Sequence, residues 1–194
     1  MGVFLLPLAA VHRTNQVEAT MRYVAVFGLL VLATPVYAGD EDLLKNAMSA
    51  APAEVGKNAT VMNWDMKELQ KGSNGFTCFP NDPTTPTNDP MCVDQNGLEW
   101  VHALMEKKEP PKKVGFGYML QGESAASNVD PFAQPPTDMK DLSKWHQAGP
   151  HIMIFNPAAG GLTGYVKPGE NADVTQPWVM WAGSPYEHLM IPTE

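Results

Sequence analysis

Apolar positions recur with helical spacing in two early segments of the chain. In residues 41–50 and 97–108 they return every three or four residues, which is the period of one face of a helix. The second segment ends in two lysines, and two prolines follow shortly after, where proline cannot continue a helix. We therefore predict an amphipathic helix over each segment.

Strand-like patterns dominate the rest of the chain. Segments 59–65, 75–79, 114–121 and 151–155 are predicted as strands, and 178–181 and 186–191 as a hairpin joined at the turn residues AGSP. Because helical segments come early and strands come late, the pattern predicts an α+β fold. We expect a mainly antiparallel sheet with helices packed on one face.

The predicted strand 114–121 contains a pair of glycines. Gly115 and Gly117 alternate with Phe116 and Tyr118, so one face of the strand carries no side chain at these two positions. Either the backbone of another element or a ligand can approach such a face closely. Close packing of a helix on the sheet is the interpretation that we favour.

A short apolar segment near the start has the organisation of a secretory signal peptide. Residues 21–38 begin with Met21 and a basic residue, continue with an apolar run and end in small residues at Val36 and Ala38. Residues 1–20 fit no part of such a signal, and we interpret them as a misassigned upstream start, with a propeptide as the alternative. Residues 39–194 then form a single globular domain that is periplasmic or secreted.

Removal of residues 1–38 leaves an acidic protein. It has 11 lysines, 20 acidic residues and no arginine, which gives a formal charge of −9. Such a surface repels the phosphates of nucleic acids and anionic lipids, which argues against both as partners. No apolar run of about 18 residues follows the signal, so we expect no membrane span in the exported protein.

The two cysteines of the chain predict a disulfide. Cys78 and Cys92 form an even pair, and in an oxidising compartment such a pair is typical of a bridge. The segment between them is rich in proline, and a bridge that closes about 15 residues contributes roughly 3 kcal/mol. The spacing suits neither a redox pair nor a metal pair. Asp82 and Asp89 lack the spacing of a calcium loop, and we interpret them as solvated acids.

A repeated His-x-Met pattern provides the candidate site. His151 and Met153 occur on one predicted strand, and His188 and Met190 occur on another. Residues two apart on a strand face the same side, so neighbouring strands in matching register would direct two imidazoles and two thioethers at one point. Two nitrogen and two soft sulfur ligands suit Cu(I). We therefore predict a protein that binds a small ligand or a metal ion, with Cu(I) as its candidate cofactor.

The closing hairpin extends this candidate site. A two-residue turn within AGSP would place Trp181 opposite Tyr186. The same register would place Val179 opposite His188 and Trp181 as a cap beside the metal. Further ligands can come from residues outside the two strands. The candidate ligand-binding residues are therefore Trp181, Tyr186, Met119 and His146.

Other functions remain open for the same residues. Methionine is an ordinary core residue, and period-two apolar positions occur in any strand. An enzyme would use His151 or His188 as a general base under the long loop 122–143 and would need an acidic partner. The sequence has no G-x-S-x-G or H-E-x-x-H motif. An interaction protein would expose aromatic residues such as Trp145 and Trp181.

Three segments of the chain carry a resemblance to known sequences. They read GFGYMLQG at 115–122, AGPHIMIF at 148–155 and PWVMWAGSPYEHLMIP at 177–192. Together they resemble a group of uncharacterised secreted bacterial proteins over about residues 49–192. The resemblance implies an exported globular protein from a bacterium. It implies no catalytic residues, since no activity is attached to that group.

Overall fold

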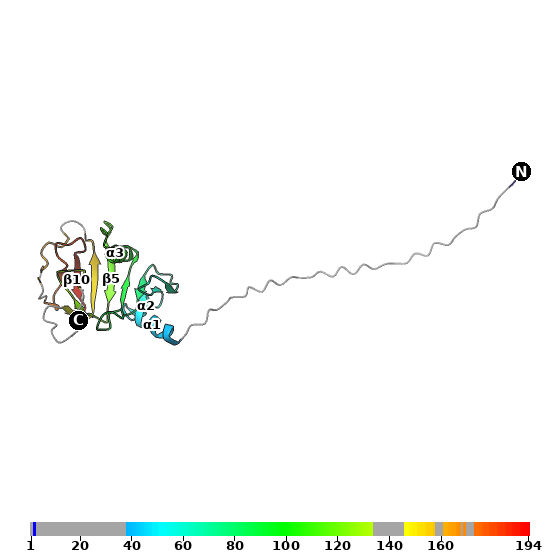
Figure 1. The fold of residues 1–194 in the computed structure, drawn as a ribbon, viewed down its shortest axis with the longest axis horizontal. Coiled ribbons are helices and arrows are strands. Elements are labelled where there is room, and N and C mark those ends of the chain that lie inside the picture. Colours follow the sequence, from blue (N-terminus) through cyan, green and yellow to red (C-terminus); the bar gives the residue numbers. More distant parts are fainter. Residues whose placement is uncertain (1, 3–37, 134–145, 158–160, 168, 170–172) are drawn as a thin grey trace. The chain divides into compact units, whose positions relative to one another are not determined.

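The computed structural model describes residues 2, 38–133, 146–157, 161–167, 169 and 173–194. From residue 36 to residue 194 the chain forms one compact unit (Figure 1). The predicted signal peptide and the residues before it lie outside the described residues, except for Gly2 and Ala38. Among the described residues, no helix has the length and apolar character needed to cross a membrane.

The described residues begin with two helices, and a third helix follows the first four of their short strands. The helices are α1 (Ala38–Met48), α2 (Ala53–Gly56) and α3 (Gln95–Met105). The strands are β1 (Thr60–Met62), β2 (Glu68–Gln70), β3 (Thr77–Phe79), β4 (Met91–Val93), β5 (Gly115–Met119), β6 (Glu123–Ala126), β7 (His146–Ala148), β8 (His151–Phe155), β9 (Trp178–Met180) and β10 (His188–Pro192).

Eight of these strands form an open sheet in the order β2-β1-β3-β4-β5-β8-β10-β9. All neighbouring pairs are antiparallel except β1 and β3, which confirms the predicted antiparallel character of the sheet. Figure 1 shows β5 and β10 within this sheet and α3 beside β5. β6 and β7 form a separate two-stranded sheet. The prediction of a loop throughout 122–143 was therefore wrong at β6, where alternating polar and small residues gave no apolar signal.

Both predicted amphipathic helices are present, as α1 and α3. The start of α3 depends on Asp94, whose carboxylate accepts a hydrogen bond from the backbone N–H of Gly97 at 2.7 Å. The same carboxylate accepts from the backbone N–H of Phe116 in β5 at 3.1 Å. One acidic side chain therefore caps the helix and holds its first turn against the sheet.

α3 packs against the face of β5 that carries the glycines. A Cβ atom added to Gly115 would lie 2.5 Å from the backbone nitrogen of Gly97, so only glycine allows α3 to approach this closely. At Gly117 the space is filled by Met153 and Phe155 of the next strand. Close packing of a helix, the interpretation favoured from the sequence, is confirmed at Gly115. We call the side of the sheet that carries Gly115 and Gly117 the glycine face.

The disulfide between Cys78 and Cys92 is present, as predicted. The two cysteines lie directly opposite each other on β3 and β4, and both are fully buried. The bridge closes residues 79–91, which we call the bridged loop. Within this loop the side chain of Asn81 accepts from the backbone N–H of Asp89 at 2.9 Å. The side chain of Asp89 accepts in turn from the backbone N–H of Asp82 at 3.2 Å. Covalent and hydrogen-bonded links thus restrain a segment that lacks its own core.

Candidate functional site

A pocket of about 190 Å³ is lined by α3, the bridged loop and the glycine face, and we call it the α3 pocket. Its position follows from the fold, because the disulfide holds the loop beside the sheet while Gly115 brings α3 close to it. The side chains that line it include acidic, aromatic and sulfur-containing groups from distant parts of the sequence. The acidic residues are Asp82, Asp89 and Glu123, the tryptophans are Trp64, Trp100 and Trp181, and the methionines are Met91, Met105, Met119, Met153 and Met180.

Two acidic residues of the α3 pocket, Asp89 and Glu123, hold their protons more strongly than solvated acids do. Burial raises the pKa of Asp89, although a hydrogen bond from Thr85 acts in the opposite direction. Burial, together with the nearby charge of Asp89, raises the pKa of Glu123 to about 7. The interpretation of Asp89 as a solvated acid was therefore wrong, since its residue is only 9% exposed. Carboxyl groups that titrate near neutrality inside a pocket are typical of functional sites.

His188 also lines the α3 pocket, and its hydrogen bond defines which ring nitrogen is protonated. Its Nδ1 lies 2.9 Å from the backbone oxygen of Tyr186. A carbonyl oxygen only accepts, so Nδ1 carries the hydrogen and Nε2 keeps its lone pair. Burial lowers the pKa of His188 to about 4. The imidazole is therefore neutral at pH 7, and Nε2 is available to a ligand.

Aromatic rings hold this imidazole in place. The ring of His188 makes edge contacts with Trp181 and Trp100, at centroid distances of 5.0 and 5.3 Å. Trp100 and Trp181 stack on each other at 6.0 Å. The indole N–H of Trp181 donates to the backbone oxygen of Ser127 at 2.7 Å. The indole nitrogen of Trp100 is buried and has no hydrogen-bond partner in the described part of the chain. The wall around His188 is thus rigid and largely apolar.

The hairpin register places Met180, and not Val179, opposite His188. The predicted register was therefore wrong by one residue, and with it the pairing of Trp181 with Tyr186. The connection runs from Trp181 to Glu187 and includes positive φ angles at Trp181 and Gly183, so it is longer than a two-residue turn. A slip of one residue exchanges the two faces of a strand. Met180 consequently joins His188 on the glycine face.

The two His-x-Met strands are neighbours, but their histidines do not meet. β8 and β10 pair with Met153 opposite Met190, so all four side chains belong to the glycine face. The antiparallel register places His151 opposite Pro192, four residues from His188 along the strands or about 13 Å. A metal centre holds its donor atoms within about 2–2.5 Å of the ion. The predicted convergence of both imidazoles on one ion is therefore not produced by this register.

His151 makes its hydrogen bond outside the α3 pocket. Its Nδ1 lies 2.8 Å from the backbone oxygen of Gly149, which precedes β8 in the chain. It lines a separate hollow of about 220 Å³ beside Trp178 and Glu194, and its Nε2 has no hydrogen-bond partner among the described residues. Both histidines therefore face backbone carbonyls at Nδ1. The carboxylate partner that a catalytic histidine needs is not found at this atom in either residue.

The other predicted ligand residues are divided between the pocket and the core. Met119 and Trp181 line the α3 pocket, as does Met153 of the original set. Met190 is fully buried in the core. Tyr186 is 4% exposed and donates its hydroxyl to the backbone oxygen of Lys108 at 2.7 Å, which gives it a structural role. His146 begins β7, and its side chain lies outside the described residues.

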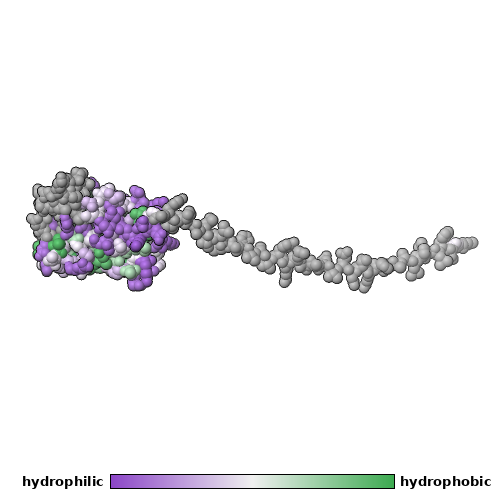
Figure 2. Space-filling view, turned by 90° about the horizontal axis from the view of Figure 1, so that it is seen from below, coloured by the Kyte–Doolittle hydropathy of each residue, from purple (hydrophilic) through white to green (hydrophobic). Residues whose placement is uncertain are grey.

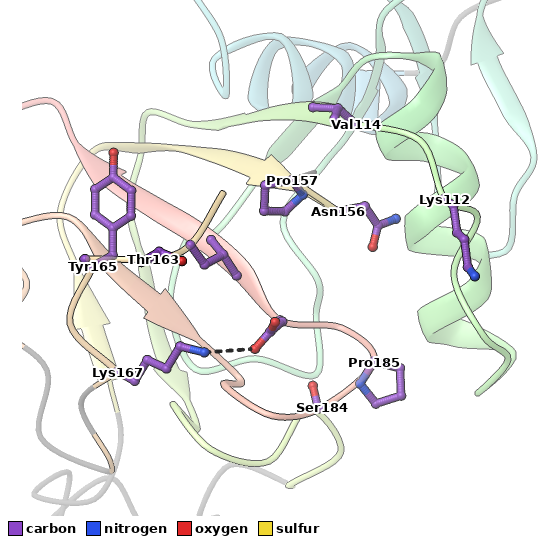
Figure 3. A pocket seen from close by; sticks show the side chains of 12 residues that line it. Lys112, Val114, Asn156, Pro157, Thr163, Tyr165, Lys167, Ser184 and Pro185 are labelled. Carbon is purple, nitrogen blue, oxygen red and sulfur yellow. Dashed lines mark ion pairs between the residues drawn. The ribbon is translucent and has the colours of Figure 1, made fainter. Parts of the chain in front are cut away.

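A second, larger hollow of about 800 Å³ lies elsewhere on the domain (Figure 3). Figure 3 shows Lys112 and Tyr165 on opposite sides of it, with Asn156 between them. Its charged groups include Lys167, which pairs with Glu187 at 3.6 Å. The walls are loops with exposed side chains, such as Tyr165 at 40% exposure. We therefore place the candidate site in the α3 pocket, where three groups with shifted pKa values, Asp89, Glu123 and His188, lie together.

The described surface gives little support to an aromatic interaction platform. Trp178 and Tyr186, two of the aromatic residues clustered near the C-terminus, are buried. On the face shown in Figure 2, hydrophilic residues cover most of the described surface, and hydrophobic residues form small separate areas. Trp145 lies outside the described residues.

Sequence reasoning missed several residues of the α3 pocket. Glu123 was assigned to a loop, and Trp100 was not singled out on its predicted helix. Met180 was expected on the opposite face because of the register error. The excess of methionine, 12 residues in the whole chain, was the available signal for a sulfur-lined pocket.

Two further findings limit what the site can be. Among the residues that the structure describes, no group of three or more His, Cys, Asp or Glu side chains is arranged to hold a metal ion. No family model matches the chain, and no match was found among curated proteins or solved structures.

Proposed function

We propose that this protein is an exported binding protein for a small cation, which occupies the α3 pocket. The observation that carries the proposal is the combination of carboxyl groups and tryptophan rings in one pocket. Each kind of group attracts positive charge by a different mechanism, and together they discriminate against anions and neutral molecules.

The carboxyl groups supply the electrostatic part of this recognition. The charge of Asp82 raises the pKa of Asp89, and the charge of Asp89 raises the pKa of Glu123, in each case beside a larger effect of burial. A cation bound among these three carboxyl groups relieves the repulsion between them and favours loss of the proton from Glu123. The positive charge of the bound ligand then replaces the positive charge of that proton.

The tryptophans supply the shape of the site. Trp64, Trp100 and Trp181 belong to three different segments and all line the pocket. An indole face that is not covered by another ring attracts cations, by about 0.5–2 kcal/mol according to its solvation. Trp64 is positioned by its own hydrogen bond to the backbone oxygen of Pro80 at 2.9 Å. The rings therefore form a preorganised wall.

The size of the pocket restricts the ligand. A volume of about 190 Å³ is of the same order as cavities of about 150 Å³ that hold a benzene molecule. The pocket suits a metal ion with its ligands or an organic cation with one ring. A folded partner or a peptide of several residues is too large.

Export is supported by the sequence and by the disulfide. The pattern of residues 21–38 is that of a signal peptide. The Cys78–Cys92 bridge is favoured in an oxidising compartment and holds the acidic bridged loop in place.

Isothermal titration of the exported protein, residues 39–194, with benzylammonium tests the proposal. Benzyl alcohol, a neutral molecule of nearly the same size, is the matched ligand. We expect benzylammonium to bind and benzyl alcohol to bind at least about tenfold more weakly, a difference of about 1.4 kcal/mol. Replacing Glu123→Gln and Asp89→Asn together should remove this preference.

The control variant is Glu187→Gln, which removes a carboxylate from the larger hollow. It should leave the affinity for benzylammonium unchanged. Equal binding of the charged and neutral probes would contradict the proposal. So would equal loss of affinity in the control and in the pocket variant.

A further inference from the structure

Sulfur is concentrated in the α3 pocket. Its five methionines come from α3 and from four strands of the sheet, so they meet only in the folded chain. They are Met91, Met105, Met119, Met153 and Met180. A thioether is a neutral, soft donor that needs no deprotonation to bind a metal. Both cysteines are in the disulfide, so methionine is the sulfur ligand that remains.

The same pocket contains a nitrogen donor. The hydrogen bond from Nδ1 of His188 to the backbone of Tyr186 leaves Nε2 as the donor atom. This is the arrangement common to metal-binding histidines, in which the other ring nitrogen is held by a backbone or carboxylate oxygen. The rings of Trp100 and Trp181 restrict rotation of the imidazole. The donor atom therefore has a defined position before any ion arrives.

Strand register places two of the methionines near His188 on the glycine face. Met180 lies directly opposite His188, where Cβ atoms on facing residues are about 5 Å apart. Met153 lies two residues along β8 from Phe155, the partner of His188, at a diagonal distance of about 7–8 Å from His188. All three side chains extend from the glycine face. These distances are within the combined reach of two thioethers and an imidazole that share one ion.

Gly117 gives one of these methionines room to adjust. A Cβ atom there would lie 2.9 Å from Cε of Met153, so the methyl group of Met153 occupies space that only glycine leaves open. Rotation about the Cγ–Sδ bond moves this methyl group and turns the lone pairs of the sulfur, and Gly117 has no side chain that such a rotation would displace. A flexible sulfur next to a fixed nitrogen suits a site that must close around an ion.

The donor set selects the metal. Calcium and magnesium prefer six or more oxygen ligands, and zinc prefers thiolates and imidazoles. Groups of that kind are not assembled among the described residues. One imidazole with two thioethers is a soft set that suits Cu(I).

We infer that the cation of the α3 pocket is Cu(I), bound by Nε2 of His188 and the Sδ atoms of Met180 and Met153. The inference rests on the proposed function, because it names the cation that the pocket takes. It replaces the set expected from the sequence. Two members of that set, His188 and Met153, are retained, and Met180 takes the place of His151 and Met190.

Competition with bicinchoninate under anaerobic, reducing conditions tests the inference. The wild-type protein should take one equivalent of Cu(I) from the chelator. Met180→Leu and Met153→Leu, which nearly preserve volume, should each weaken Cu(I) binding by about tenfold or more, and the double variant more strongly. The matched control is Met190→Leu, which removes an equally buried sulfur from the same face and should leave the affinity unchanged.

A second measurement does not depend on variants. X-ray absorption at the copper edge of the loaded wild-type protein should show two sulfur neighbours and one nitrogen neighbour. A shell of nitrogen and oxygen alone would overturn the assignment, as would equal losses for Met190→Leu and Met180→Leu. If benzylammonium binds and Cu(I) does not, the copper inference fails and the proposed cation function stands. If neither binds, both fail.

Discussion

Met180 lies directly opposite His188 in the pairing of β9 with β10, and both side chains belong to the glycine face. This relationship places a thioether beside an imidazole whose Nε2 keeps its lone pair. It also connects the last strands of the chain with α3, because Trp100 of that helix contacts the same imidazole. The α3 pocket thus depends both on the register of β9 with β10 and on the packing of α3 against the sheet.

Removal of the disulfide should destabilise the protein and disturb the acidic part of the pocket. The bridge joins residues separated by 14 positions, and the loop that it closes corresponds to about 3 kcal/mol of unfolding free energy. We expect Cys78→Ala with Cys92→Ala to lose about this amount in urea denaturation. Reductant should destabilise the wild type in the same way and have no effect on the double variant. A wild type that is insensitive to complete reduction would contradict the prediction.

Burial of Glu123 should make stability fall as pH rises. Its pKa is raised from 4.5 to about 7 in the folded protein, so its stabilising effect is fully present below 4.5 and is lost as pH rises through 7. This pKa shift corresponds to a loss of about 3 kcal/mol in the free energy of unfolding between pH 4.5 and pH 8. Glu123→Gln should remove this part of the pH dependence in urea denaturation.

The pKa shift of His188 changes stability with pH in the opposite direction. The contribution of Glu123 must therefore be measured as the difference between the wild type and Glu123→Gln. Its pKa is lowered from 6.5 to about 4, so its contribution is present above 6.5 and is lost as pH falls through 4. In the wild type the two effects partly cancel between pH 4.5 and pH 6.5. Once Glu123 is replaced, stability should rise with pH across this interval. An unchanged profile in Glu123→Gln would show that the carboxyl group is not buried in the folded state.

Cation affinity should depend on pH through the same carboxyl group. Because the proton on Glu123 must leave when a cation binds, we expect benzylammonium to bind about tenfold more tightly at pH 8 than at pH 6. The probe itself stays charged over this range. Titration calorimetry at the two pH values measures the difference and the released proton. In Glu123→Gln the affinity should be weaker and nearly independent of pH, and a persistent dependence would assign the proton to another group.

A side chain at Gly115 should separate α3 from the sheet. Its Cβ would lie 2.5 Å from the nitrogen of Gly97, and overpacking of this kind costs about 1–3 kcal/mol. Gly149→Ala is the matched control, because a Cβ there meets nothing within 4 Å. We expect Gly115→Ala to lower the free energy of unfolding and Gly149→Ala to change it little. Equal stability of the two variants would argue against the close contact.

Local features of the fold could be predicted from the sequence because they depend on neighbouring residues. The helical period of residues 97–108 predicted α3, and the short β-branched run at 151–155 predicted β8 at its observed bounds. The disulfide followed from the number of cysteines. Of the candidate site, His188, Met153, Met119 and Trp181 do line the α3 pocket. Glu123 and Trp100 could not be identified because their significance arises from burial beside distant segments.

The sequence by itself determined the local periods, the bridge between Cys78 and Cys92, and the two His-x-Met strands with their side chains on a common face. Tertiary structure alone decided the registers, which separate His151 from His188 and bring Met180 to His188. The physical reason is that side chains alternate between the two faces of a sheet along a strand. A change of one residue in register therefore moves each side chain of that strand to the other face. The α3 pocket also required contact between Gly97 and Gly115, which no local pattern specifies.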